Sequence, residues 1–284
     1  MKDVNKIKIK INLYKYRYLI YLILLAIALL VFIKILPYIN IPTDATTMGI
    51  VGTLLGAIVG GIFTLIGSIY VNNKQLTANF EIKRKNIIYR PLYDELLEVN
   101  KIITEENPYP TYIVFEKRTQ TIVRHPQLDA WNRINSDSRI LETPECLKKQ
   151  YNKLIDSIKK YEKERNTVNE PIKNALNEEL SKKLNTSCSI TNIGDVISSD
   201  ILENKFSRHC LNSYINNPFN IGEDVSNERI LELQQTLLKR CNEIDEVKNV
   251  RNIYNDWIKE QNKTIELLEN LIIEIGIKYE KQRS

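Results

Sequence analysis

The sequence holds few of the residues on which metal binding and nucleophilic catalysis depend. It has two histidines, His125 and His209, and four cysteines, none of which forms a CxxC pair. The short ligand spacings of structural zinc sites are therefore missing. His209 directly precedes Cys210, but adjacency along the chain is not the spatial pairing that catalysis requires. We expect no metal site and no catalytic residue.

The motifs of the common enzyme classes are also missing. The sequence contains no GxxxxGK[ST] phosphate loop, no GxGxxG, no HExxH and no GxSxG. Most carboxylates fall on the polar faces of periodic helices, where solvation explains them better than paired acid–base catalysis does. We therefore expect no cofactor. An enzyme ranks third among the functions considered, because residues 91–284 could fold around a cleft but no motif marks one.

Glycine is scarce and unevenly distributed. Six of the nine glycines lie in MGIVGTLLGAIVGGIFTLIGSIYV, residues 48–71, a segment without charge. At about 1.5 Å per residue this segment exceeds the roughly 30 Å hydrocarbon core of a bilayer, which predicts a transmembrane helix. A second apolar run, YLIYLILLAIALLVFIKILPYI at residues 18–39, predicts another span, in which Lys34 lies close enough to the end to reach the interface.

Charge predicts the orientation of this hairpin. Residues 1–17 carry a net charge of +5 and residues 74–90 one of +4, whereas the loop 40–47 has no Lys or Arg. The positive-inside rule places both termini in the cytoplasm and leaves only residues 40–47 outside. The first span is predicted to be retained, because its apolar region is longer than that of a signal peptide and no small-x-small cleavage site follows. The expected localisation is the cell membrane, with two spans.

The basic charge is confined to the membrane-proximal segments. Residues 91–284 are net −4, so a nucleic-acid partner is not expected. In the basic helix 72–90, Lys83, Arg84 and Lys85 are predicted to contact lipid headgroups, since each basic side chain near an anionic surface contributes about 1 kcal/mol. The cysteines fall in the cytoplasmic part, where reduced thiols are the rule; they are Cys146, Cys188, Cys210 and Cys241.

The glycines of the second span form one stripe at helical spacing, the small-residue pattern that lets helices approach closely in lipid. The stripe consists of Gly49, Gly52, Gly56, Gly60 and Gly67. Two partners for it stay open. One is the first span, whose only small residues are Ala26 and Ala28, and the other is a second copy of the same span.

The rest of the chain reads as helices. The second span is expected to continue as a helix to residue 90, and a new amphipathic helix is expected at 91–106, after Pro91. Its apolar face comprises Leu92, Leu96, Val99 and Ile103. NPYPTY predicts a loop, YIVFEKRTQTIV fits a strand or a helix, and DAWNRINSDSRIL predicts a short helix that buries Trp131 and Ile134.

Two longer stretches carry heptad periodicity. The first seam should be kinked at Pro171, and it comprises Leu147, Tyr151, Leu154, Ile158, Tyr161, Arg165, Val168, Ile172, Ala175 and Glu179. The second is expected to run unbroken over Ile230, Leu233, Leu237, Arg240, Ile244, Val247, Arg251, Tyr254, Ile258, Gln261, Ile265, Leu268, Ile272, Ile275 and Tyr279, widened by Val250, Trp257 and Leu271. Between them we expect a linker at 186–200 and a shorter helix at about 196–215.

The predicted fold class is mainly α, with a transmembrane hairpin at 18–71 followed by a coiled-coil-like bundle of long helices. This layout resembles that of many prokaryotic membrane proteins, and the resemblance implies no mechanism. The sequence favours a membrane-anchored oligomeric scaffold or adaptor with a cytoplasmic protein partner. The alternative is a small pore-forming or membrane-perturbing effector. A water-filled pore needs a polar stripe, and the second span offers only Thr53, Thr64 and Ser68.

Overall fold

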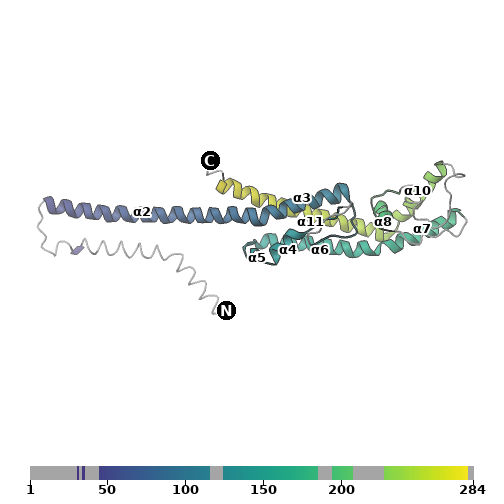
Figure 1. Ribbon diagram of the computed structural model, residues 1–284, viewed down its shortest axis with the longest axis horizontal. Coiled ribbons are helices and arrows are strands. Elements are labelled where there is room, and N and C mark those ends of the chain that lie inside the picture. Colours follow the sequence, from purple (N-terminus) through teal and green to yellow (C-terminus); the bar gives the residue numbers. More distant parts are fainter. Residues whose placement is uncertain are drawn as a thin grey trace, which may run out of the picture. The chain divides into compact units, whose positions relative to one another are not determined.

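The computed structural model describes residues 31, 34–35, 45–115, 124–184, 194–206 and 227–280 (Figure 1). These residues are mainly helical and include no strand, which confirms the mainly α fold class. The chain divides into two compact units, Met1–Gln75 and Leu76–Ser284. The first predicted span lies outside the described residues except for Val31, Lys34 and Ile35, so the hairpin stays a prediction.

Helix α2 (Ala45–Arg84) contains the second predicted span. Among the described residues, one run of helix, Gly52–Glu106, is long and apolar enough to cross a membrane. An 18-residue stretch of this run, called the apolar window below, has a mean hydropathy of 2.1. None of that window is buried. Many large apolar side chains of α2 are exposed, among them Ile50, Leu54, Phe63, Leu65 and Tyr70.

The helix passes through Pro91 instead of restarting there as the sequence predicted. A π-helical turn, η2 (Lys85–Tyr89), joins α2 to α3 (Arg90–Lys101), and α3 continues into η3 (Ile102–Glu106). The Arg90 N–H bonds to the Lys85 carbonyl, five residues back. The wider turn accommodates a proline, which lacks an N–H and clashes with the carbonyl four residues earlier in an α-helix. The predicted apolar face of residues 91–106 is buried as expected.

After η3 the chain leaves helical geometry at the predicted NPYPTY loop, where Tyr109 has a φ of 52°. Val114 bridges to Gln127 as an isolated β-type pair, and the intervening residues 116–123 are outside the described part. Two short helices follow, α4 (Asp129–Asn135) and α5 (Arg139–Glu142). The single short helix predicted over 129–141 is divided by a turn at 136–138, whereas Trp131 and Ile134 are buried as expected.

The first heptad seam is confirmed. It lies on α6 (Glu145–Thr167) and α7 (Asn169–Leu184), and all its members are buried except the half-buried Glu179. The two helices meet at Val168, and Pro171 lies in the first turn of α7, where a proline needs no hydrogen bond from its nitrogen. The predicted interruption therefore occurs three residues before the proline itself.

Helix α8 (Gly194–Leu202) begins inside the segment predicted as a linker and ends well before residue 215. Asn204, at a φ of 61°, terminates it. The Asn204 N–H bonds to the Ile201 carbonyl at 2.9 Å and the Lys205 N–H to the Asp200 carbonyl at 2.7 Å, which is a Schellman motif. Asparagine tolerates this left-handed conformation, and the sequence interpretation overlooked it. Residues 207–226 are outside the described part.

The second seam is not one unbroken helix. It is divided into α10 (Asn227–Asn242) and α11 (Asp245–Ile275), which ends in the π-helical turn η4 (Gly276–Glu280). Ile244 separates them with an extended ψ of 128°. On α11 the buried face is rotated toward the flanking positions: Val250 and Trp257 are buried, whereas Ile258, Ile265 and Ile272 are half-buried.

Helix α11 forms the centre of the second unit, where it packs on α6 and on α3 (Figure 1). The Tyr254 hydroxyl donates to the Ile103 carbonyl at 2.6 Å, and Gln261 Nε2 donates to the Leu96 carbonyl at 3.2 Å. These two bonds fix α11 antiparallel to the α3–η3 helix. Trp257 is fully buried between them and donates to Gln261 Oε1 at 3.0 Å. The polar groups of Tyr254, Trp257 and Gln261 are thus all hydrogen-bonded, as burial requires.

Candidate functional site

The glycine stripe of α2 has open space in front of it. A Cβ atom added at any of the α2 glycines would meet no described atom outside the local helix within 4 Å. These glycines are Gly49, Gly52, Gly56, Gly60, Gly61 and Gly67. The described residues therefore supply no neighbour for the stripe, and the choice between the first span and a second copy stays a prediction.

The hydroxyl groups beside the glycines are bonded within their own helix. Thr53 Oγ1 donates to the Gly49 carbonyl at 2.9 Å, and Thr64 Oγ1 donates to the Gly60 carbonyl at 2.9 Å. Ser68 Oγ donates to the Thr64 carbonyl at 2.8 Å. Each hydroxyl therefore has an acceptor four residues back and can lie in lipid without contact with water.

The three basic residues predicted to contact headgroups lie in different environments. Lys83 is exposed, and Arg84 pairs with Glu81 at 3.0 Å. Lys85 is only 2% exposed and forms an ion pair with Glu280. This pair connects η2 to η4, so Lys85 holds the end of the C-terminal helix within the described structure.

The described cysteines and histidine do not come together. Cys146 is exposed and Cys241 is buried. Burial raises the pKa of the Cys241 thiol to about 12, so this thiol is protonated at neutral pH. His125 stacks on Tyr112 with ring centroids 4.5 Å apart. Within the described ranges, no three His, Cys, Asp or Glu side chains are placed to hold a metal ion. Cys188, His209 and Cys210 lie outside those ranges.

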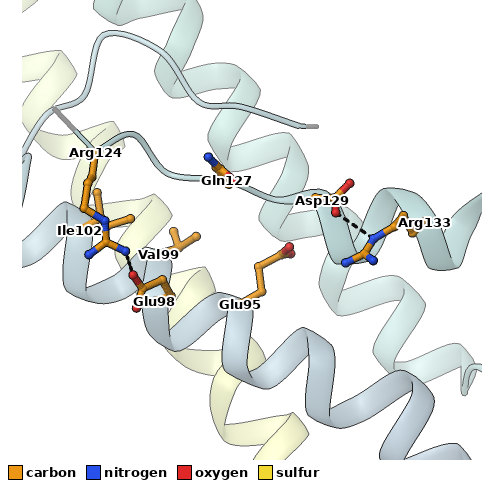
Figure 2. Close-up of a pocket in the computed structure, with 8 residues that line it drawn as sticks. All are labelled: Glu95, Glu98, Val99, Ile102, Arg124, Gln127, Asp129 and Arg133. Carbon is orange, nitrogen blue, oxygen red and sulfur yellow. Dashed lines mark ion pairs between the residues drawn. The ribbon is translucent and has the colours of Figure 1, made fainter. Parts of the chain in front are cut away.

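A cleft in the second unit was not predicted from the sequence. It has a volume of about 270 Å³ and lies between α3 and the segment that leads into α4 (Figure 2). Its lining combines three carboxylates, two arginines and apolar side chains, namely Glu95, Glu98, Val99, Ile102, Arg124, Gln127, Asp129 and Arg133. The cleft is therefore strongly charged and has an apolar floor.

Both arginines of the cleft are engaged by carboxylates. Arg124 forms ion pairs with Glu98 and, at 3.1 Å, with Glu106. Arg133 pairs with Asp129 at 2.8 Å, one turn away on α4 (Figure 2). These pairs leave Glu95 as the carboxylate of the lining that has no ion pair with either arginine.

Glu95 spans the gap between α3 and α4. Its Oε2 accepts a 2.6 Å hydrogen bond from the Ala130 N–H, so the carboxylate caps the first turn of α4 from another helix. Oε1 is buried and has no hydrogen-bond partner among the described residues. Burial raises the pKa of this carboxyl to about 7, against the opposing effect of the backbone N–H groups of Ala130 and Asp129.

A second buried oxygen without a hydrogen-bond partner among the described residues lies close enough to Glu95 to feel its charge. Tyr151 on α6 is fully buried, its ring stacks on Trp131 at 4.3 Å, and its hydroxyl has no hydrogen-bond partner in the described structure. The charge of Glu95 adds to the effect of burial in raising the Tyr151 pKa. A carboxylate oxygen of α3 and a hydroxyl of α6, which can donate as well as accept, thus both lack a hydrogen-bond partner in the same region of the described structure.

The sequence contained only a weak indication of this cleft. Glu95 lies beside the apolar face of α3, next to Leu96, where the periodicity gives no reason to distinguish it from a solvated carboxylate. Its partners follow a segment whose secondary structure the sequence left undecided. Comparison with known proteins adds no further constraint, because no protein-family model, curated protein or solved structure matches the chain.

Proposed function

We propose that this protein is a membrane-anchored oligomeric scaffold or adaptor whose helical unit binds a cytoplasmic partner. The observation that carries the proposal is the contrast between the two units. The apolar window of α2 is 0% buried, whereas the apolar face of α11 is covered by α6 and α3. One unit buries its apolar surface within the chain, and the other needs an environment that the described chain does not supply.

A bilayer is the environment that fits α2 best. Leaving a large apolar side chain in water instead of burying it costs about 1.5–3 kcal/mol, and α2 exposes many. On this proposal α2 is the second of two spans, with residues 18–39 as the first and residues 40–47 outside. The positive-inside rule then places both termini in the cytoplasm, where the helical unit is available to a partner.

The open glycine stripe supports the oligomeric part of this proposal. In lipid, small residues at i and i+4 favour helix association because the backbones approach closely. The local hydrogen bonds of Thr53, Thr64 and Ser68 favour packing over a water-filled lumen, since none of these hydroxyls needs a water molecule. We therefore prefer the scaffold to the pore-forming effector, which remains the alternative.

The partner surface is proposed to lie on the helical unit, because the external loop offers only about eight residues for recognition. Exposed apolar side chains there include Leu141 on α5, which is 83% exposed, and Ile277 on η4. Scattered apolar residues are common on protein surfaces, so these two positions are starting points for mutagenesis and do not define an interface.

The test is purification of the full chain from membranes, followed by mass determination of the solubilised complex. The proposal expects the protein to resist extraction by alkaline carbonate, to elute as a defined oligomer and to carry a stoichiometric cytoplasmic protein. Release by carbonate would overturn the membrane anchor. A monomer without any associated protein would overturn the scaffold.

A further inference from the structure

Helix α4 is joined to α3 by a hydrogen bond and to α6 by a pair of stacked rings. Glu95 Oε2 on α3 accepts the Ala130 N–H at 2.6 Å, and the Trp131 ring stacks on Tyr151 of α6 with centroids 4.3 Å apart. With seven residues, α4 is much shorter than the roughly 12–15 residues that an isolated helix needs in water. Its position therefore depends on its contacts with the longer helices.

The hydrogen bond from Ala130 satisfies only one oxygen of the Glu95 carboxyl. The other oxygen, Oε1, is buried and has no hydrogen-bond partner among the described residues. An ionised carboxyl in this position is a buried charge with one donor, and a buried charge costs far more free energy than a buried neutral polar group. The packed arrangement of α3 and α4 therefore suits the protonated form of Glu95.

The two charged groups of α4 act on Glu95 in opposite directions. Asp129 raises the pKa of Glu95 and Arg133 lowers it, and these two side chains pair with each other at 2.8 Å. Burial is the largest effect and outweighs the N–H groups of Ala130 and Asp129. The pKa of Glu95 is consequently about 7 instead of the usual glutamate pKa of 4.5.

Groups that reach α3 from the other elements are paired or neutral. Arg124, on the segment that leads into α4, forms an ion pair with Glu98. Tyr151 on α6 is neutral, because burial raises the pKa of its hydroxyl. From α11, Tyr254 and Gln261 donate hydrogen bonds to backbone carbonyls of the α3–η3 helix. In the described structure, these groups give the buried carboxyl of α3 no second donor.

We infer that the Glu95–Ala130 contact is a proton-controlled latch, which holds α4 against α3 while Glu95 is protonated and releases α4 when Glu95 ionises. Release allows water to hydrate the carboxylate, which burial prevents. Helix α4 is the part that moves, because Leu92 and Leu96 fix α3 in the core, where both are fully buried. The inference goes beyond the proposed function and holds whether or not α2 lies in a membrane.

The direction of the pH effect follows from the two pKa values. The closed state, with a Glu95 pKa of about 7, binds the proton more tightly than an open state in which the hydrated carboxyl has its usual pKa of 4.5. The closed state is fully stabilised below pH 4.5, and this stabilisation is lost as the pH rises to 7. The ratio of closed to open molecules should fall about 50-fold or more between pH 5 and pH 8.

Hydrogen exchange of the full-length, detergent-solubilised protein tests the latch. Mass spectrometry follows exchange in peptides that cover α4 (129–135) and α6 (145–167) at pH 5 and pH 8, with each rate corrected for the intrinsic pH dependence of amide exchange. We expect the protection of α4 to be about 50-fold or more lower at pH 8. Urea below the unfolding transition should leave exchange in α4 unchanged and accelerate it in α6, because a local opening exposes little surface.

Two variants separate the Glu95 proton from other titrations. Glu95→Gln keeps the shape of the side chain and removes its charge, so the protection of α4 should be the same at both pH values. Asp94→Asn alters the exposed carboxylate next to it in the sequence and should follow wild type. A pH dependence that persists unchanged in Glu95→Gln overturns the inference.

Two outcomes on the wild-type chain also overturn it, and they do not depend on the folding of a variant. One is equal protection of α4 at pH 5 and pH 8. The other is exchange in α4 that responds to urea as strongly as exchange in α6 does, because α4 would then open only when the whole helical unit unfolds.

Discussion

At the scale of single residues, two of the buried tyrosines have opposite hydrogen-bonding states. The Tyr161 hydroxyl donates to the Pro110 carbonyl at 2.9 Å, whereas the Tyr151 hydroxyl has no partner in the described structure. Tyr161→Phe should lower the free energy of unfolding by about 1 kcal/mol, because it removes one buried hydrogen bond. Tyr151→Phe should leave it unchanged or raise it slightly. Chemical denaturation of both variants checks this, and an equal loss in the two would contradict it.

The Glu95 carboxyl should make stability depend on pH. Its folded-state pKa of about 7 lies above the usual glutamate pKa of 4.5, so the native state binds this proton more tightly than the unfolded chain does. The stabilisation is complete below pH 4.5 and is lost as the pH rises to 7. The difference in unfolding free energy between wild type and Glu95→Gln should change by roughly 3 kcal/mol over this range. Denaturation at four pH values measures it, with Asp94→Asn as the variant that should parallel wild type.

Arg165 shows what residue-scale reasoning from the sequence can and cannot reach. The heptad period predicted that this position faces the core, and the side chain is 1% exposed. The heptad pattern gave no information about which residues Arg165 would contact. Arg165 Nε donates to the Tyr109 carbonyl at 3.2 Å and Nη2 to Ser198 Oγ at 2.9 Å, across separations of 56 and 33 residues. Burial follows from local spacing, but hydrogen-bond partners follow from tertiary packing.

At the scale of elements, the same division between local pattern and packing appears on α11. Its apolar period predicted a helix with a buried seam, but the buried face centres on Val250 and Trp257 because α6 and α3 cover it from two sides. The helix ends at Ile244 and Asn204 were not predicted, because isoleucine and asparagine also occur within helices. The cleft at Glu95 could not be predicted for a related reason: it needs two segments whose approach no periodicity encodes.

The position of the buried face can be tested by aspartate substitutions along α11. Val250→Asp and Leu268→Asp should each lower the unfolding free energy by about 3–5 kcal/mol, because they bury an unpaired charge. Ile258→Asp, at a half-buried position, should cost less, about 1–2 kcal/mol, since its carboxylate can reach water. Asn262→Asp is the exposed control and should stay within about 0.5 kcal/mol. Equal losses at Val250 and Asn262, measured by denaturant unfolding, would mean that the face is assigned incorrectly.

At the scale of the whole molecule, the first prediction concerns the proposed membrane topology. Net charges of +5 and +4 flank the proposed hairpin, so the loop between the spans should be external. An impermeant thiol reagent added to intact cells should label a Thr43→Cys variant. It should not label the exposed Cys146 until the cells are opened. Labelling of Cys146 in intact cells would contradict the cytoplasmic placement of the helical unit.

The second prediction at this scale concerns what fills the space before the glycine stripe, and Gly56 is the position to test. A side chain there meets no described atom within 4 Å, so Gly56→Leu should leave the fold of the helical unit intact. If a second copy packs on the stripe, the leucine separates the two backbones and the defined oligomer is lost. If the first span packs there, the oligomer survives while the hairpin within each monomer loosens. Native mass measurement in detergent distinguishes these outcomes.

The same variant separates the scaffold from the pore. A scaffold assembled through the stripe conducts no ions in a planar bilayer, with or without cross-linking of its helical unit, because the hydroxyls of Thr53 and Thr64 are bonded to their own helix and leave no polar lining. We therefore expect silent recordings from wild type and from Gly56→Leu. Currents in wild type that Gly56→Leu abolishes would reverse the preference, since they would show that close packing of the glycines builds a conducting assembly.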